Sequence, residues 1–376
     1  MEKTSRFKTV LNNPFGYAKQ LKLENGRRIV GTFLSDVPEE LIDAAGLLPF
    51  ALIDGSKTQT LTTSIPGFAC SLVINTMNQA LQNRLDFLDG IVIPHLCDSS
   101  RALFHILQKN FPDQFSDLLG LPMKLGSQGT KTYLVGEMKR FQKALENAFT
   151  VTISNEALLK SIITYNENRH YLRTIKALRL QNPDFMTNYD FFSLVKSSML
   201  MPKKDHNKIL INILNKRIES PKRNSHRRPV LKIFVSGKLV EPLEIFKWMD
   251  ELGIVVSDDD LAVGSRYFSY EIKPEGDPIN ALAESYFHRI PNTFVQGTEN
   301  RLSYLLSRIQ ENNLKGVIFI QLKSCDPLTY DYPDLKKALD QKGIPNLFIE
   351  TNLQTLAAGQ IKTKLQAFNE ILEGNL

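Results

Sequence analysis

Two stretches of this chain alternate short apolar runs with amphipathic segments. The first stretch contains three predicted strands, RRIVGTFLS, PFALIDG and LDGIVIPHLC. The second stretch, from VLKIFVSG to NLFIE at residues 230–350, repeats the same rhythm. Consecutive parallel strands need a crossover connection, which is usually a helix. We therefore expect an α/β fold with two Rossmann-like (flavodoxin-like) parallel-sheet domains that face a central cleft, where the ligand site of such sheets lies.

The region between the two stretches has a helical pattern. A chain of 376 residues is too long for one compact core of ordinary size. Residues 135–218 carry apolar side chains at three- and four-residue spacing, and Ser154 is a predicted helix start. The predicted division is an N-terminal helical extension (1–27), a first α/β domain (28–134), a helical bridge with a basic linker (135–228) and a second α/β domain (229–376).

The composition is that of an ordinary globular protein, with 42% hydrophobic and 23% charged residues. No apolar stretch is long enough to span a membrane, and the charged N-terminus lacks the apolar region of a secretory signal. We therefore expect a cytoplasmic protein with reduced thiols and no membrane partner.

The net charge of +6 does not indicate nucleic-acid binding. Much of the excess falls in 202–228, which we interpret as a solvated linker without interleaved aromatic residues or a nucleic-acid-binding motif. A nucleotide or coenzyme A phosphate is the expected anionic partner.

Three cysteines, Cys70, Cys97 and Cys325, lie where a loop leaves a predicted strand or opens a predicted helix. For a single cysteine, burial as a small hydrophobic residue is the simpler interpretation. An odd count of three at such junctions favours a shared ligand set over a disulfide. Backbone N–H groups at a helix N-terminus stabilise a thiolate, as metal centres require.

The spacing of the cysteines favours an iron–sulfur cluster over zinc. No local C-x2-4-C pair is present, although zinc sites usually contain one. A cubane cluster with its fourth iron not bound by cysteine suits the count, although the ferredoxin spacing is absent. The segments IVIPHLCD and VIFIQLKSCD are alike, so Cys97 and Cys325 are expected on equivalent loops of the two domains, facing the cleft that holds Cys70.

Several segments together resemble one protein family. They are GTFLSDVPEELIDAAGLLPFAL, ACSLV, DFLDGIVIPHLCDSSRAL, ITYNENR, IVVSDDDLAVGSRYF, SCDP and GQIKTKLQAFNEIL. In this order they resemble the 2-hydroxyacyl-CoA dehydratase and benzoyl-CoA reductase subunit family, over about residues 25–372.

The resemblance implies a lyase subunit that carries an oxygen-sensitive [4Fe–4S] cluster on Cys70, Cys97 and Cys325. It also implies a heterodimer with a homologous second subunit and a separate ATP-dependent iron–sulfur activator. The implied substrate is a 2-hydroxyacyl-CoA thioester, which loses water through a ketyl radical after one-electron reduction. Two alternatives remain open: an accessory, non-catalytic subunit of such a complex, and a subunit of an aryl-CoA reductase of the benzoyl-CoA type.

Two further residues are candidates for catalysis. Glu40, in PEEL, matches an acidic position of the family and is expected near the cluster or in proton transfer. Its structural alternative is a carboxylate stabilised by the helix dipole. Ser35 is a candidate hydrogen-bond donor to ligand or substrate, with helix capping as its alternative.

Four other features are weaker candidates. Ser99 and Arg101 are candidates for loop ordering or phosphate binding, with a surface salt bridge as the alternative. His95 is interpreted as a packed side chain at a strand end. The run Asp258–Asp260 is interpreted as a solvated turn rather than a divalent metal site, because it lacks alternating ligands and a glycine at the sharp turn.

Overall fold

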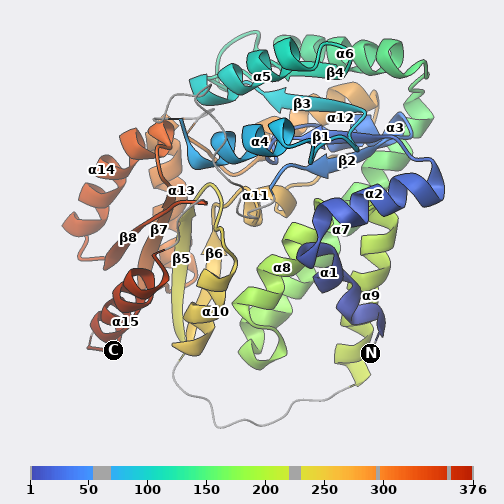
Figure 1. Cartoon of the computed structure of the whole chain (residues 1–376). Coiled ribbons are helices and arrows are strands. Elements are labelled where there is room, and N and C mark those ends of the chain that lie inside the picture. The colour runs from blue at the N-terminus through green and yellow to red at the C-terminus, as the bar shows by residue number, and fades with distance from the viewer. Residues whose placement is uncertain (1, 54–68, 220–229, 294–296, 354–356, 375–376) are drawn as a thin grey trace.

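Two four-stranded parallel sheets organise the computed structural model of this chain, which describes residues 2–53, 69–219, 230–293, 297–353 and 357–374 (Figure 1). The first sheet contains β1 (Ile29–Thr32), β2 (Leu48–Ala51), β3 (Gly90–Pro94) and β4 (Phe115–Leu119). The second contains β5 (Leu231–Gly237), β6 (Ile254–Asp259), β7 (Gly316–Leu322) and β8 (Asn346–Thr351). The predicted α/β class with two parallel sheets is confirmed. Strand β4, FSDLL, was not predicted, because the adjacent polar residues Ser116 and Asp117 interrupt the apolar pattern of a short strand that is only partly buried.

The two sheets have the same strand order. It is β2-β1-β3-β4 in the first sheet and β6-β5-β7-β8 in the second. In each sheet the second strand in chain order lies on one side of the first strand, and the third strand lies on its other side. Strand β1 is therefore paired with β3, and β5 with β7. The loops that leave these neighbouring strands diverge to opposite sides, and such a point forms a crevice at the carboxyl end of a parallel sheet.

Helices cover the sheets and continue between them. Those of the first half are α3 (Glu39–Ala44), α4 (Ser71–Leu81) and α5 (Asp98–Asn110). Those of the second half are α10 (Glu244–Glu251), α11 (Ser265–Phe268), α12 (Pro278–Ser285), α13 (Gly297–Glu311), α14 (Asp326–Gln341) and α15 (Ala358–Gly374). Helix α12 packs against α6 (Thr130–Phe149), next to the first sheet. The predicted domain boundaries therefore stay a prediction.

The helical middle begins with α6 and continues through α7 (Asn155–Gln181), α8 (Asn188–Ser198) and α9 (Lys203–Glu219). As predicted, Ser154 caps α7, and its hydroxyl accepts a hydrogen bond from the backbone of Ala157 at 3.1 Å. The N-terminal helices α1 (Glu2–Asn12) and α2 (Pro14–Asn25) lie beside this layer, where α1 contacts α8 and α9.

Helix α9 corrects the interpretation of 202–228 as a solvated linker. For residues 203–219 that interpretation is wrong, because α9 packs along α7 and buries Lys203, His206 and Leu210. Its polar sequence hides one apolar face of a helix. Residues 220–229 lie outside the described part of the chain.

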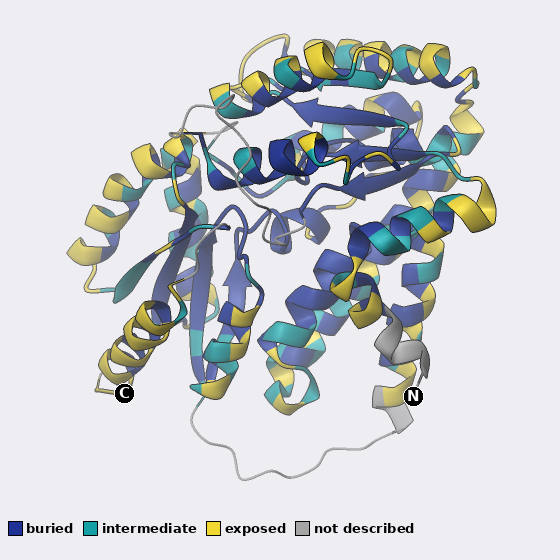
Figure 2. Cartoon of the chain, viewed as in Figure 1, coloured by how far each residue is buried: buried dark blue, intermediate teal, exposed yellow. Residues whose placement is uncertain are grey.

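The main apolar core is continuous from the N-terminal helices through both sheets to α15. A second, smaller cluster packs α13 and α14 on the other face of the second sheet. Figure 2 shows most of the strands buried, β8 only partly buried, and exposed residues on the outer faces of α6, α14 and α15. No helix in the described ranges combines the length and apolar character needed to cross a membrane.

Candidate functional site

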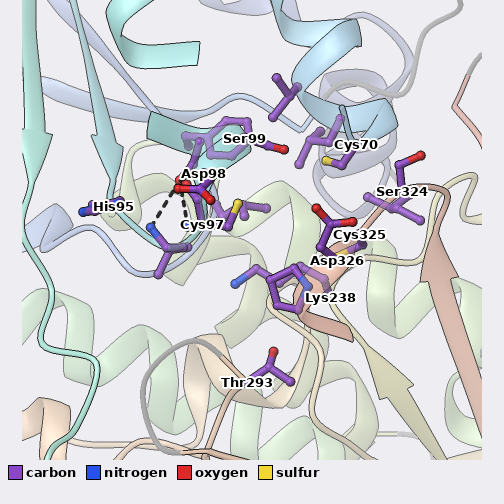
Figure 3. Close-up of a pocket in the computed structure, with 18 of the residues that line it drawn as sticks. Cys70, His95, Cys97, Asp98, Ser99, Lys238, Thr293, Ser324, Cys325 and Asp326 are labelled. Carbon is purple, nitrogen blue, oxygen red and sulfur yellow. Dashed lines mark hydrogen bonds between the residues drawn. The ribbon is translucent and has the colours of Figure 1, made fainter. Parts of the chain in front are cut away.

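Each of the three cysteines is the residue immediately before a helix. Cys70 precedes α4, Cys97 precedes α5 and Cys325 precedes α14. The expected helix start at Cys70 is thereby confirmed. All three side chains line a single cavity of about 480 Å³ (Figure 3). The N-termini of three helices therefore lie at the wall of the cavity, and their backbone N–H groups stabilise negative charge there.

The positions of Cys97 and Cys325 are equivalent in the two sheets. Cys97 follows β3, the third strand of the first sheet in chain order, and Cys325 follows β7, the third strand of the second. Cys70 lies at the start of α4, after β2. The cavity thus lies where the carboxyl ends of the two sheets approach each other.

Backbone and hydroxyl contacts hold these loops. The N–H of Ser71 donates to the carbonyl of Lys323 at 3.4 Å, which joins the start of α4 to the loop of Cys325. The Ser100 hydroxyl accepts from the N–H of Cys97 at 3.1 Å and donates to its carbonyl at 2.8 Å. These hydrogen bonds hold the loops that carry the cysteines at the N-terminal ends of the helices.

Two residues of the cavity wall adopt left-handed backbone conformations without being glycine. Leu34 has a φ of 65° and Ser324 a φ of 61°. Such conformations cost energy for residues with a Cβ, and they concentrate at functional sites. They lie after β1 and β7, one in each half of the chain.

Burial disfavours ionisation of two of the thiols, those of Cys70 and Cys325. It raises the pKa of Cys325 to about 12, and the Cys70 thiol nearby adds to the rise. The ammonium of Lys238 acts in the opposite direction on the pKa of Cys325. Burial also raises the pKa of Cys70, although N–H groups in the first turn of α4 lower it. A metal centre here would have to displace protons from these thiols.

The cavity also contains polar groups that sequence reasoning missed. Lys238, directly after β5, lines it and pairs with Asp36 at 3.2 Å. Thr293 lines it as well, and its buried hydroxyl has no hydrogen-bond partner among the described residues. A lysine after the strand VLKIFVSG was a possible signal, since strand ends of this kind were already expected to face the cleft.

Glu40 and Ser35 are near the start of α3 but do not line this cavity. Glu40 is buried in an ion pair with Arg169 of α7, whose guanidinium also donates to the Tyr270 hydroxyl at 2.8 Å. Ser35 is buried and does not cap α3, because Pro38 occupies the N-cap position. Their proposed catalytic roles stay predictions.

A second buried ionic group lies beside Glu40 and was also missed. The Tyr267 hydroxyl donates to the Glu39 carboxylate at 2.8 Å, and Lys203 pairs with the same carboxylate at 3.1 Å. Burial raises the pKa of Glu39, while Lys203 and Tyr267 lower it. The first turn of α3 is therefore bonded to α9 and α11.

The interpretation of Asp258–Asp260 as a solvated turn is wrong, because all three carboxylates are buried. The first pairs with Lys176 at 2.6 Å, the second accepts from Ser265 at 2.7 Å and the third pairs with Arg301 at 2.8 Å. The cations Lys176 and Arg301 are distant in sequence from the acids that they satisfy, so the local pattern did not reveal these pairs.

The remaining candidates divide between the cavity and the surface. His95 and Ser99 line the cavity (Figure 3). Arg101 is exposed and pairs with Asp98 at 3.1 Å, as the surface alternative predicted. Within the described residues, no three His, Cys, Asp or Glu side chains are grouped to hold one metal ion.

Comparison with known proteins identifies relatives along almost the whole chain. The family described as 2-hydroxyglutaryl-CoA dehydratase, D-component, matches residues 34–372. The beta subunit of (R)-phenyllactyl-CoA dehydratase from Clostridium sporogenes is 30% identical over 373 residues, with 97% of each chain covered. The beta subunit of lactoyl-CoA dehydratase from Anaerotignum propionicum is 28% identical, with 98% of each chain covered. One of the subunits of benzoyl-CoA reductase from Thauera aromatica is 27% identical, with 88% of this chain and 87% of the relative covered.

Proposed function

Because the chain belongs to the 2-hydroxyglutaryl-CoA dehydratase D-component family, we propose that it is an iron–sulfur subunit of a 2-hydroxyacyl-CoA dehydratase-like enzyme. The complex would be a cytoplasmic heterodimer with a homologous subunit, reduced by an ATP-dependent activator. Its reaction would be loss of water from a 2-hydroxyacyl-CoA thioester through a ketyl radical. The meeting of Cys70, Cys97 and Cys325 at one cavity is the observation that carries the proposal.

The donor set of the cavity suits a [4Fe–4S] cluster. The thiols come from three separate helix starts and line a space of about 480 Å³. A cluster bonds each thiolate to a different iron atom, so its ligands lie farther apart than those of one ion. When bound, the cluster would supply a one-electron redox centre and one iron atom without a protein thiolate.

The residues of this chain would bind and shield that centre. Cys70, Cys97 and Cys325 would be its ligands, and the N–H groups of the helix starts would stabilise their thiolates. Phe33 and Leu96 are buried beside them and limit the access of water. Lys238 would contribute a positive charge to the same space.

Anaerobic purification with iron and sulfide analysis and EPR spectroscopy tests the cluster. We expect about four iron atoms per chain, and fewer in Cys70→Ala, Cys97→Ala or Cys325→Ala. Ser99→Ala is the matched control, since it changes the cavity wall but no thiol, and should keep its iron. Stoichiometric zinc, or no metal after anaerobic handling, would refute the proposal.

An accessory, non-catalytic role is the second candidate. It is favoured by Glu40, which is buried in a pair with Arg169 and does not line the cavity. Turnover of Cys97→Ala with the wild-type partner and activator separates the two candidates. A catalytic subunit should lose activity, whereas unchanged turnover would leave only the accessory role.

The substrate class is tested with the assembled complex. The relatives from Clostridium sporogenes and Anaerotignum propionicum are dehydratase subunits, which is why we propose a 2-hydroxyacyl-CoA substrate. The benzoyl-CoA reductase relative makes reduction of an aryl-CoA thioester the competing reaction. Incubation of the reduced complex with each thioester class, followed by product analysis, distinguishes loss of water from ring reduction.

A further inference from the structure

The cavity that the three cysteines line contains one buried lysine. Lys238 is only 3% exposed, and it directly follows Gly237 at the end of β5. Figure 3 shows its side chain extending toward the space bordered by Cys97 and Cys325. A charge in so poorly hydrated a place acts strongly on its neighbours, because little water screens it.

Lys238 is paired with a carboxylate of the first half of the chain. Asp36 accepts a hydrogen bond from the ammonium at 3.2 Å. Burial raises the pKa of Asp36, but Lys238, Arg289 and Arg266 together lower it below its usual value. Arg266 also pairs with Asp260 at 3.5 Å. The charge of Lys238 lowers the pKa of the Cys325 thiol, so this charge acts on a residue that lines the cavity.

We propose that Lys238 is a positioning residue that raises the reduction potential of the cluster held by Cys70, Cys97 and Cys325. This inference rests on the proposed function, because it presupposes the cluster. Reduction adds one electron and no bond is made or broken, so the site gains a negative charge. The nearby ammonium stabilises that reduced state, and Asp36 sets how much of its charge is felt. Net charge and hydrogen bonding near a cluster are known determinants of its potential.

An anaerobic redox titration followed by EPR tests the inference, with Ti(III) citrate as the reductant. In Lys238→Met, the ratio of reduced to oxidised cluster at a given potential should fall about tenfold, which is about 59 mV for a one-electron couple. Lys238→Arg keeps the charge and should stay near the wild-type potential. Lys323→Met is the matched control, since Lys323 is exposed on the loop of Cys325 and does not line the cavity.

Asp36→Asn gives an independent test with the opposite sign. It removes the negative partner but leaves the ammonium, so the reduced fraction should rise. If Lys238→Met does not retain iron, Asp36→Asn must still show this rise. Wild-type potentials in both Lys238→Met and Asp36→Asn, with iron retained, would overturn the inference and leave the proposed function standing. A wild-type chain without iron would instead overturn both.

Discussion

The ammonium of Lys238 donates a hydrogen bond to the carboxylate of Asp36 across 202 residues of sequence. Asp36 lies after β1 and Lys238 after β5, the first strand of each sheet. Cys97 and Cys325 lie after the third strands. The ends of the first and third strands of each sheet therefore lie near the cavity. The residues after the two first strands form an ion pair, and those after the two third strands include two of the thiols.

The buried pair of Asp36 and Lys238 should be energetically coupled. Removing one partner leaves a buried charge with poorer compensation, which is strongly destabilising. A double-mutant cycle of Asp36→Asn and Lys238→Met, measured by urea unfolding, should give a coupling of about 1 to 3 kcal/mol. The exposed pair of Lys336 and Asp340 on α14 is the control and should show no measurable coupling. Additive effects at Asp36 and Lys238 would show that each acts alone.

Glu40 should stabilise the fold through its buried pair with Arg169. Glu40→Gln leaves the buried guanidinium without its carboxylate, and we expect a loss of about 3 to 5 kcal/mol in the free energy of unfolding. Chemical denaturation measures this loss. Asp98→Asn breaks the exposed pair with Arg101 and is the control, with no measurable change expected. Wild-type stability with lost turnover in Glu40→Gln would instead support a role in proton transfer.

The parallel sheets and the meeting of the cysteines were predictable because their signals are local. An apolar strand such as β3 or β7, followed by a cysteine and a helix start, is visible in any short window. Parallel topology then brings the carboxyl ends of such strands to one side. These two facts place Cys97 and Cys325 at the carboxyl ends of their own sheets. The further expectation that the two domains face one cleft then brings the two cysteines together.

The buried ionic pairs were not predictable, because they join residues far apart in sequence. Glu39 meets Lys203 and Asp36 meets Lys238, and neither pair has a recurring spacing. Polar stretches such as 203–219 and Asp258–Asp260 therefore resembled solvated segments. Only the tertiary contacts show that their charges are buried and compensated.

His206 should make the free energy of unfolding decrease as the pH falls. Burial and the nearby Lys203 charge lower the pKa of His206 to about 3, and its Nδ1 lies 2.9 Å from the Asn168 amide nitrogen. In the unfolded chain the imidazole of His206 binds a proton near pH 6.5, whereas in the folded chain it stays neutral down to about pH 3. The contribution of neutral His206 to the free energy of unfolding is therefore complete above pH 6.5 and is lost as the pH falls toward 3. Between pH 6.5 and 5 the loss should be about 2 kcal/mol.

Urea unfolding across this pH range, in wild type and His206→Gln, measures the effect. The variant should be less stable at neutral pH, because it loses buried hydrogen bonds, and should show a shallower decline in acid. His170→Gln, which replaces an exposed histidine of α7, is the matched control. Parallel wild-type and His206→Gln curves would contradict the assignment.

Gly237 should be required for the approach of β5 to β7. A Cβ at this position would lie 2.1 Å from the carbonyl oxygen of Ile320, which pairs with Gly237 in the sheet. Gly237→Ala must therefore displace β7, the strand that leads to Cys325, and should cost about 1 to 3 kcal/mol. Gly136→Ala in α6 is the control, because no described atom lies within 4 Å of its added Cβ, and it should gain about 0.5 to 1 kcal/mol. Iron content should fall in Gly237→Ala alone, since only that change moves a predicted ligand. Full stability and iron content in Gly237→Ala would show that β7 adjusts without moving the thiol.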